Sequence, residues 1–368
     1  MTAHTPKIGL LLLNVGTPEA PTTGAVRRYL AEFLSDPRVI DIPALPRWLL
    51  LHGIILRTRP RKSAHAYRAV WTAEGSPLLA NTLAFRDGLR RELGEHWQVE
   101  VGMRYGKPSI AAALKALKAG QVDRLVVAPL FPQEASATTG TALEAVYRAL
   151  APLWNVPAVS VVPPFFDDDG FLEEFAELGR LRRDHGRPDH VLFSFHGLPE
   201  RQIHKGDDRK AHCLRDATCC DAMTAKNRHC YRAQAVHTAM QIARRMSLPE
   251  GSWSVSFQSR LGRTKWIGPY TEEVLVDLAK KEGVKRLMVM CPAFVADCLE
   301  SLEEIALRAK ETFVEAGGEE LHLVPSLNAR PSWVHAFARI ARRAAGEEGE
   351  VADNAAFRRH TTGQHARV

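Results

Sequence analysis

Short apolar runs alternate with amphipathic helical segments along most of the chain. The runs are continuous rather than alternately apolar and polar, which is typical of parallel strands whose two faces are both covered. Four runs precede residue 186 and four follow it, so the pattern predicts two similar sheets. The expected strands are residues 8–13, 98–103, 124–128, 157–162, 190–195, 253–257, 286–290 and 321–324.

Helical segments between these strands predict βαβ units with right-handed crossovers. We therefore expect an α/β fold with two doubly wound, Rossmann-like halves, each built on a parallel four-stranded sheet. The halves are residues 1–165 and 166–330, followed by a helix at 331–345 and a disordered tail at 346–368 that lacks an apolar stripe. In such folds the active crevice lies outside the carboxyl ends of the strands. The expected helices of the two halves include 22–35, 108–119, 171–185, 271–282 and 298–316.

Composition adds a local basic feature to an otherwise ordinary globular protein. The 368 residues are 45% hydrophobic and 25% charged, with a net charge of +7. Part of the excess lies in RTRPRK at residues 57–62, which favours a site for acidic ligands or anionic lipid. No basic helix or array of aromatic residues is present, which argues against a nucleic-acid partner.

No segment reaches the roughly 18 apolar residues that a membrane span requires, so we expect a cytoplasmic protein with reduced or metal-bound cysteines. Residues 43–57, PALPRWLLLHGIILR, are apolar almost all round. Such a helix is usually buried. The alternative is a lip at the mouth of a pocket, resting on the surface of the inner membrane, and the basic residues that follow favour it. We therefore expect peripheral membrane contact through residues 43–62, here called the lip segment.

One candidate catalytic group is His196, in the motif HVLFSFHGLPE at the end of an expected strand. A histidine at a strand end is often structural. His196 stands in a tight turn with Gly197 and Pro199, and an ordinary imidazole pKa of about 6.5 suits proton abstraction at neutral pH.

A second candidate is an acidic ladder formed by Asp297, Glu300 and Glu304. On a helix these positions share one face, where three carboxylates repel one another unless a cation or a proton lies between them. The alternative is a solvated helix face that also carries Glu303. In that case Asp297 would cap the helix and Glu300 would complete a capping box.

The cysteines form two groups. Cys291 and Cys298 flank a strand end and are expected in the core or a pocket wall, whereas the other four crowd one polar segment. That crowding favours a metal, either as an iron–sulfur cluster with four thiolates or as zinc with His212 or His229 as substitutes. A disulfide is the weakest alternative in a reducing compartment. The four residues are Cys213, Cys219, Cys220 and Cys230.

Six motifs, in order between about residues 8 and 335, resemble the ferrochelatase family. The resemblance implies a type II chelatase fold with the C-terminal helix packed back across both halves. It also implies a lyase that inserts Fe²⁺ into protoporphyrin IX to form protohaem (haem b), the last step of haem biosynthesis. The motifs are NVGTPEAP, YRAVWTAEGSPL, VGMRYGKP, FSFHGLPERQIHKGD, FQSRLGRTKWIGPYTEE and CPAFVADCLESLEEI.

The resemblance also implies roles at single positions. His196 and Glu300 match the catalytic histidine and glutamate that handle the substrate iron, and Asp297 and Glu304 match acids that continue the line away from the porphyrin. The implied porphyrin-binding residues are Arg59, Tyr67 and Ser76 at the propionate end, the pair Arg104 and Tyr105, the aromatic Trp266 and Phe294, and Val15 on the metal side.

The chain departs from the common family pattern in two places. Cys298 stands where many relatives carry histidine, and residues 211–231 resemble an internal cluster-bearing insertion of some bacterial ferrochelatases. The resemblance therefore implies a 2Fe–2S cluster on the four insertion cysteines, with zinc as the rival metal. Alternative functions are a chelatase for coproporphyrin or cobalt, and a tetrapyrrole-binding or iron-sensing protein whose working part is the cysteine segment. The sequence leaves the oligomeric state open.

Overall fold

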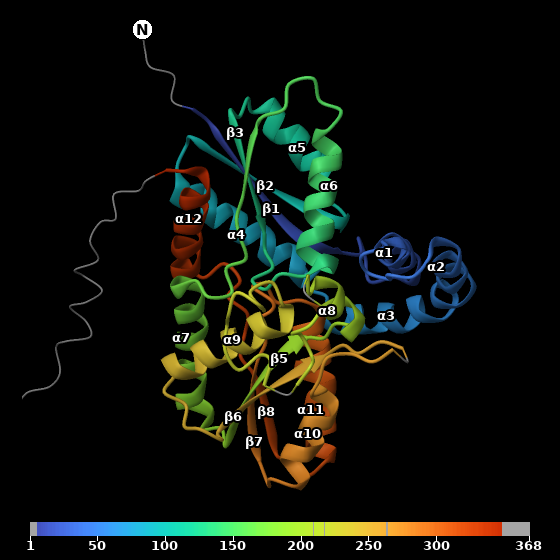
Figure 1. Ribbon diagram of the computed structural model, residues 1–368, viewed down its shortest axis with the longest axis vertical. Helices are drawn as coiled ribbons and strands as arrows, with labels where there is room; N and C mark the ends of the chain where they lie inside the picture. The colour runs from blue at the N-terminus through green and yellow to red at the C-terminus, as the bar shows by residue number, and fades with distance from the viewer. Residues whose placement is uncertain (1–5, 209, 217, 263, 348–368) are drawn as a thin grey trace, which may run out of the picture.

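The computed structural model describes residues 6–208, 210–216, 218–262 and 264–347. Two parallel four-stranded sheets lie one above the other along the molecule (Figure 1). Their eight strands fall where the apolar runs predicted them, so the doubly wound α/β fold is confirmed. The predicted tail lies outside the described residues from position 348 onward, as do residues 209 and 217 of the cysteine segment.

The N-terminal sheet has the strand order β2-β1-β3-β4. The central strand β1 is a continuous apolar run because both of its faces are covered. Leu10 and Leu12 belong to the core under α4 and α12, whereas Leu11 and Leu13 pack toward α5 and α6. The elements are β1 (Ile8–Thr17), α4 (Pro77–Leu93), β2 (Trp97–Gly106), α5 (Ile110–Ala119), β3 (Arg124–Pro129), η2 (Ser136–Gly140), α6 (Thr141–Leu150), β4 (Ala158–Val161) and α12 (Pro331–Ala345).

The C-terminal sheet repeats this arrangement with the order β6-β5-β7-β8. Phe193 of β5 faces the core shared with α7 and α9, and its neighbour Leu192 faces the core shared with α10 and α11. The elements are α7 (Asp169–Gly186), β5 (His190–His196), α8 (Glu200–Gly206), α9 (Tyr231–Arg245), β6 (Trp253–Gln258), α10 (Thr271–Lys280), β7 (Arg286–Met290), η3 (Glu300–Ala309), α11 (Lys310–Glu315) and β8 (Glu320–Leu323).

Helix α12 joins the two halves. Its Trp333 ring stacks on Phe85 of α4, with centroids 5.8 Å apart, and contacts Phe171 of α7 at 6.0 Å. The final helix therefore packs back across both halves. It is shared between them, so the core is continuous from one sheet to the other.

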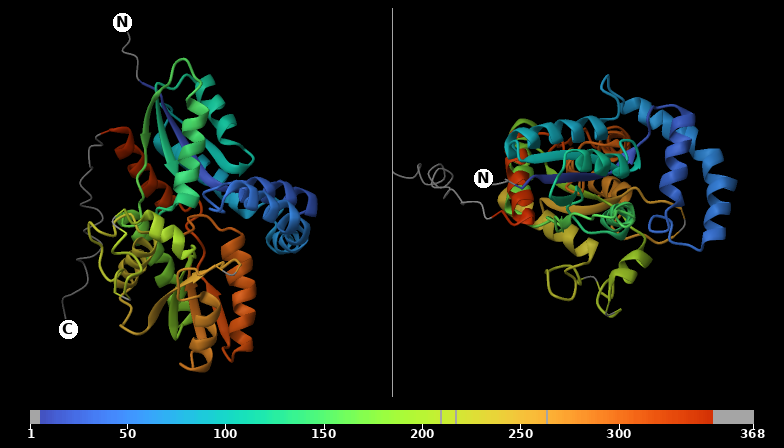
Figure 2. Two further views of the ribbon diagram at one scale, coloured as in Figure 1. Left: turned by 45° about the vertical axis from the view of Figure 1, so that its right-hand side comes forward. Right: turned by 90° about the horizontal axis from the view of Figure 1, so that it is seen from above.

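The segment between β1 and α4 projects sideways from the two halves (Figures 1 and 2). It holds the lip segment, which is helical: α2 has no buried residue, whereas Leu51, Ile55 and Leu56 are buried in an apolar cluster with α1 and α3. None of the described helices is long and apolar enough to cross a membrane. The projecting elements are α1 (Thr23–Ser35), α2 (Ala44–Leu50), η1 (Leu51–Ile55) and α3 (Leu56–Val70).

The helix expected at residues 298–316 differs from the prediction. Glu300–Ala309 form the π-helix η3, and only Lys310–Glu315 form a regular α-helix. Asp297 precedes this helix, so the three acids of the ladder do not all belong to one α-helical face. π-helical turns are rare and are found frequently at functional sites.

Candidate active site

His196 ends β5 at the carboxyl edge of the C-terminal sheet. Its Nδ1 lies 2.7 Å from the carbonyl oxygen of Gly197. Because a carbonyl only accepts hydrogen bonds, Nδ1 carries the proton and the basic lone pair of the neutral ring is on Nε2. The indole of Trp266 lies beside the imidazole, with ring centroids 6.3 Å apart. His196 is half-buried, and this tautomer makes Nε2 the nitrogen that can accept a proton.

Gln258 connects His196 to Glu300. It ends β6 and is the register partner of His196 in the sheet. Its side-chain amide donates to the carbonyl oxygen of Glu300 at 3.1 Å. The first residue of η3 is therefore fixed beside the end of β5, although the two lie 104 positions apart in the sequence.

The carboxylate of Glu300 faces the N-terminal half. Burial raises the pKa of Tyr67 on α3, and the negative charge of Glu300 raises it further. The pKa of Tyr29 on α1 is also raised, by burial first and then by its neighbours Tyr67 and Glu300. Glu300 thus lies between the C-terminal half and the helices around the lip segment.

Asp297 is a tethered, buried carboxylate. Its oxygens accept hydrogen bonds from the Ser301 hydroxyl at 3.1 Å, the Ser326 amide at 3.1 Å and the Asn328 side chain at 2.8 Å. The alternative of a capping box does not hold, because the amide of Asp297, which the Glu300 side chain would cap, donates instead to the side chain of Asn328 at 2.8 Å.

Glu304 is also bound to protein donors. Its carboxylate accepts from the amide of Ser259 at 2.9 Å and from the hydroxyl of the same residue at 2.6 Å. Ser259 directly follows β6 and adopts a left-handed backbone, with φ of 67°. Sequence reasoning missed Gln258 and Ser259, although both lie in the motif FQSRLGRTKWIGPYTEE at a strand end.

Two of the other implied site residues meet at the junction of the halves. Val15 from the end of β1 and Phe294 from the loop after β7 both pack on an apolar cluster around Leu78 and Cys298. Tyr67 is buried on α3, and Arg59 lies on the exposed face of the same helix. The hydroxyl of Ser76 accepts a hydrogen bond from Thr17 at 2.7 Å.

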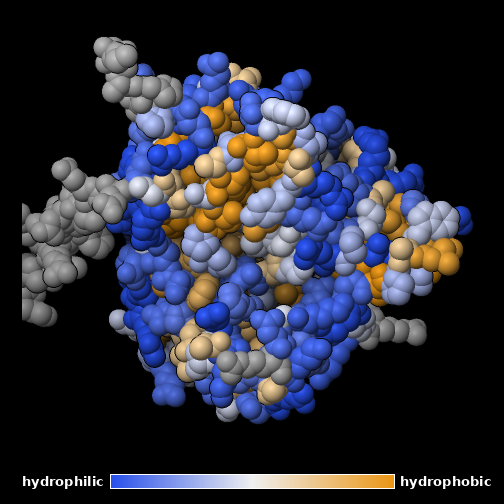
Figure 3. Space-filling view, turned by 45° about the horizontal axis from the view of Figure 1, so that its top comes forward, coloured by the Kyte–Doolittle hydropathy of each residue, from blue (hydrophilic) through white to orange (hydrophobic). Residues whose placement is uncertain are grey.

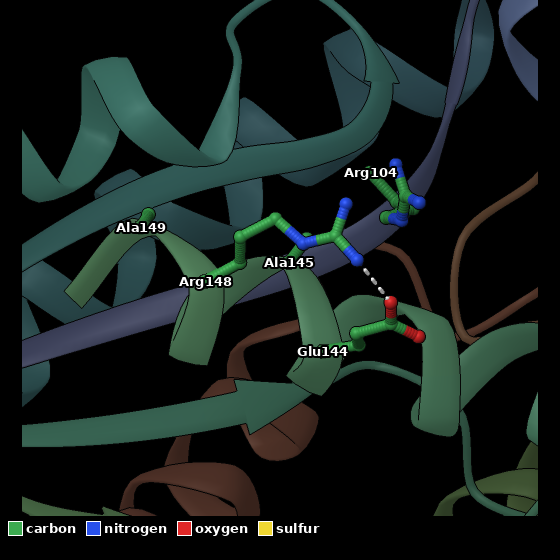
Figure 4. Close-up of a pocket in the computed structure, with 5 residues that line it drawn as sticks. All are labelled: Arg104, Glu144, Ala145, Arg148 and Ala149. Atoms are coloured by element: carbon green, nitrogen blue, oxygen red, sulfur yellow. Dashed lines mark hydrogen bonds and ion pairs between the residues drawn. The ribbon is translucent and has the colours of Figure 1, made fainter. Parts of the chain in front are cut away.

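Arg104 and Tyr105 are bound to a carboxylate that the sequence did not single out. Asp36 accepts from the guanidinium of Arg104 at 2.6 Å and from the hydroxyl of Tyr105 at 2.9 Å. Tyr105 is fully buried. Arg104 lines a pocket of about 320 Å³ with Glu144 and Arg148, whose side chains pair in Figure 4. Arg104 and Tyr105 therefore form these hydrogen bonds within the N-terminal half.

The four cysteines of the segment are buried free thiols. The sulfurs of Cys219 and Cys220 are 3.6 Å apart. A hydrogen bond that the Cys220 thiol donates to Cys230, and then burial, raise the pKa of the Cys220 thiol. Burial raises that of Cys213, and the neighbouring Cys219 and Cys220 add to it. The four thiols are thus close enough to influence one another's pKa. Among the described residues, however, no three His, Cys, Asp or Glu side chains are arranged as a metal site.

The two histidines near these cysteines behave differently. Nε2 of His212 is buried without a hydrogen-bond partner among the described residues. His229 is exposed, and its Nδ1 lies 3.0 Å from the carboxylate of Glu134. Of these two histidines, only His212 presents an unsatisfied buried nitrogen among the described residues.

Asp41 connects the loop before the lip segment to the turn that follows His196. Its carboxylate accepts from Arg201 at 2.6 Å and from Lys205 at 2.8 Å, both on α8. Burial opposes ionisation of Asp41, but these hydrogen bonds outweigh it and lower the pKa to about 2. The N-terminal half is thereby fastened to the helix that begins four residues after His196.

Replacing Asp41 with Asn should loosen this connection. We expect the KM for porphyrin to rise by about threefold or more and the stability at pH 7 to fall by about 1–2 kcal/mol. An Asp carboxyl has an unfolded pKa of about 3.9. Because the pKa of Asp41 is lower in the folded protein, its ionised carboxylate stabilises the fold fully at pH values above about 3.9. This stabilisation is lost as the pH falls toward 2. Urea unfolding of both proteins between pH 7 and 2 checks this, and a stability difference that persists at pH 2 would contradict it.

Two solved structures with a similar fold identify the fold class of this protein. The solved structure described as "SirB from Bacillus subtilis with Fe3+" matches with a TM-score of 0.52 and 14% identity, covering 94% of this chain and 98% of its own. The sirohydrochlorin chelatase SirB from Bacillus subtilis subspecies spizizenii matches with a TM-score of 0.50 and 12% identity, covering 93% and 97%. The protein therefore has the type II chelatase fold.

The family model for ferrochelatase matches residues 7–345. A ferrochelatase of Coxiella burnetii (strain CbuG_Q212) is 47% identical over 337 residues, covering 92% of this chain and 94% of the relative. One from Azotobacter vinelandii is 49% identical over 346 residues, covering 93% and 99%. The chain therefore belongs to the ferrochelatase family. The predictions of a porphyrin metal chelatase and of iron insertion for haem synthesis are confirmed.

Proposed function

We propose that the protein inserts Fe²⁺ into protoporphyrin IX, with His196 as the base that removes pyrrole protons and Glu300 beside it. The observation that carries this assignment is the link through Gln258, which pairs with His196 in the sheet and bonds the Glu300 carbonyl. The tautomer of His196 supports it, because the lone pair of Nε2 is available to take a proton. Val15 and Phe294 come from different halves and share one apolar cluster, which supports a macrocycle bound in contact with both halves.

The planar macrocycle shields its own nitrogens, so metal insertion requires a bent ring. Contacts far from the reacting atoms supply this strain, which is typically about 1–5 kcal/mol. Trp266 beside the imidazole and the apolar Val15 and Phe294 are placed to hold the ring. Arg59 on α3 would pair with a propionate in the bidentate geometry that lysine cannot reproduce.

The remaining acids are proposed to carry protons out or to lead hydrated iron in. Oxygen ligands suit this traffic because they hold Fe²⁺ less tightly than thiolates do. Glu304 is held by Ser259, and Asp297 by Ser301, Ser326 and Asn328, so neither carboxylate can turn toward a ligand without losing hydrogen bonds. The structure therefore supports a direct role for Glu300 more strongly than for the two tethered acids.

We further propose that the four segment cysteines hold a 2Fe–2S cluster. Two sulfurs on one tetrahedral metal with bonds of about 2.3 Å are about 3.8 Å apart, which is close to the 3.6 Å between Cys219 and Cys220. The unpartnered Nε2 of His212 also fits a group that is bound there, as a ligand of the rival zinc or as a donor to sulfur. A cluster would supply folding energy to the segment, because unpaired buried thiols give it little.

Peripheral membrane contact through the lip segment is part of the proposal, on an otherwise cytoplasmic protein. Four large apolar side chains are exposed on it: Leu45 at 68%, Trp48 at 57%, Leu49 at 54% and Ile54 at 59%. They lie on the projecting helices, where Figure 3 shows an apolar area at the outer end. Basic residues follow directly at 57–62, which suits an anionic surface.

Replacing Trp48 and Leu49 together with serine should weaken binding to anionic phospholipid vesicles by about tenfold or more, since two apolar side chains no longer enter the interface. Trp154→Ser is the matched control, because Trp154 is 98% exposed but lies in the loop after α6. Vesicle sedimentation at low and high salt measures the effect. Equal losses in both variants would contradict the proposed contact.

Anaerobic incubation of the purified protein with Fe²⁺ and protoporphyrin IX tests the proposed activity. Loss of porphyrin fluorescence together with the haem absorbance spectrum is expected, and turnover with coproporphyrin III should be slower. Faster turnover with coproporphyrin would assign the alternative substrate. Tight porphyrin binding without any metallation would favour a tetrapyrrole-binding or iron-sensing protein instead.

A further inference from the structure

A buried tyrosine connects the cysteine segment to the candidate base. Tyr231 directly follows Cys230 and is the first residue of α9. Its side chain is buried, and its hydroxyl donates to the backbone carbonyl of His196 at 2.7 Å. The chemistry proposed above makes no use of this hydrogen bond.

The sheet explains why the carbonyl of His196 needs such a donor. Backbone groups of successive strand residues point to opposite sides. The amide of Gly197 donates to Gln258 on the β6 side, so the carbonyl of His196 is directed to the β7 side. The last register pair with β7 joins Phe193 to Met290, three residues earlier. β7 has therefore ended, and Tyr231 supplies the donor that the strand cannot.

The same tyrosine is tied to the cysteines by backbone contacts. The amide of Cys230 donates to the carbonyl of Asn227 at 2.8 Å. The side chain of Asn227 donates to the carbonyl of Cys219 at 3.0 Å. Direct contacts thus lead from Cys219 through Asn227 and Cys230 to Tyr231, and from there to His196.

Helix α9 gives this connection a fixed support on the N-terminal half. The amide of Glu134 donates to the side chain of Gln234 at 2.6 Å, and Gln133 donates to the hydroxyl of Thr238 at 3.1 Å. Both acceptors lie on α9, and both donors lie in the loop after β3. The residues of α9 that follow Tyr231 are therefore held by the N-terminal half. Tyr231 lies between this fixed part of the helix and the cysteine segment, so a shift of the segment changes the position of Tyr231.

We propose that Tyr231 is a positioning residue for iron insertion. Its hydroxyl fixes the turn that carries His196. When the cysteine segment is ordered, Tyr231 is held in place, and the imidazole of His196 keeps its direction. This inference rests on the proposed role of His196 as the base. It assigns the cysteine segment an effect on the rate that requires no contact with the porphyrin.

The test compares Tyr231→Phe with Ser332→Ala in the full-length protein. Each variant loses one side-chain hydrogen bond: the hydroxyl of Tyr231 donates to His196, whereas the hydroxyl of Ser332 on α12 donates to the carboxylate of Glu174 at 2.6 Å, which belongs neither to α9 nor to the turn that carries His196. We expect Tyr231→Phe to lower kcat by about tenfold with the KM for porphyrin changed less than about twofold, because a small displacement of a reacting group is costly. Hydrogen–deuterium exchange of the peptide spanning residues 190–200 should become faster in that variant only.

A second readout tests the connection to the cysteines. Cys220→Ser should accelerate exchange of the same peptide, and Tyr231→Phe should add little to it in the double variant. Unchanged exchange and unchanged kcat in Tyr231→Phe, or the same losses in Ser332→Ala, would overturn the inference. Failure of the proposed base is distinguishable, because it would show as turnover in His196→Ala and would leave the exchange result of Tyr231→Phe as it is.

Discussion

Replacing His196 with alanine is expected to lower the rate of iron insertion by about a thousandfold, within the range of roughly 10²–10⁴ typical of general-base catalysis. Porphyrin should still bind, because in the proposed site the ring would be held by other residues, such as Val15, Phe294 and Trp266. Stopped-flow metallation under anaerobic conditions measures the rate, and quenching of protein fluorescence by free-base porphyrin measures the binding.

His335→Ala is the matched control for this variant. His335 is an exposed histidine on α12 whose Nδ1 lies 2.8 Å from the carboxylate of Glu92, far from the end of β5 in the sequence. Its removal should leave the rate within about twofold, as is usual for a surface substitution. Substantial turnover in His196→Ala would refute the assignment of the base.

Replacing Cys220 with serine is expected to remove the proposed cluster and, with it, to destabilise the protein. A structural metal contributes folding energy, and loss of one ligand should lower the melting temperature by about 10 °C. The intrinsic rate of the remaining folded protein should fall less than in His196→Ala, because the cluster does not touch the reacting nitrogens. Calorimetry, iron and sulfide analysis and a visible spectrum of air-protected protein give the readouts.

Cys291→Ser separates the cluster from a general loss of buried thiols. Cys291 is equally buried, but it lies in the core after β7, away from the segment. Its variant should keep the metal content and the visible absorbance of the parent. A parent protein that contains zinc and lacks iron–sulfur absorption would contradict the cluster.

The strands could be predicted from sequence because each is a local signal. Leu10 to Leu13 are apolar in succession since both faces of β1 are covered, and no distant partner need be known to recognise this. The position of His196 followed for the same reason, because the end of an apolar run in a parallel sheet marks the edge where ligands bind.

The ties within the site could not be predicted because they join distant residues. The carboxylate of Asp297 meets Asn328, and that of Glu304 meets Ser259, across 31 and 45 positions. The offsets of the acids predicted an α-helical face, whereas the chain forms a π-helix whose first carbonyl bonds Gln258. Periodicity in a sequence indicates which residues are buried, but it does not identify their hydrogen-bond partners. The hydrogen bonds that hold these acids could therefore not be predicted from it.

The assignment of Arg104 and Tyr105 shows a similar limit. A motif places both residues near the end of β2, but both side chains donate hydrogen bonds to the carboxylate of Asp36, which lies at the end of α1. Whether a side chain faces a ligand or a neighbouring carboxylate depends on the packing of α1 against the sheet. Their contact with porphyrin stays a prediction.

The central claim is that His196 and Glu300 meet one porphyrin held between the two halves. A crystal structure of the protein with free-base protoporphyrin IX tests it most directly. The account predicts the macrocycle beside Val15 and Phe294, with Nε2 of His196 directed at the pyrrole nitrogens and a propionate near Arg59. A porphyrin bound elsewhere, with His196 and Glu300 facing different surfaces, would contradict it.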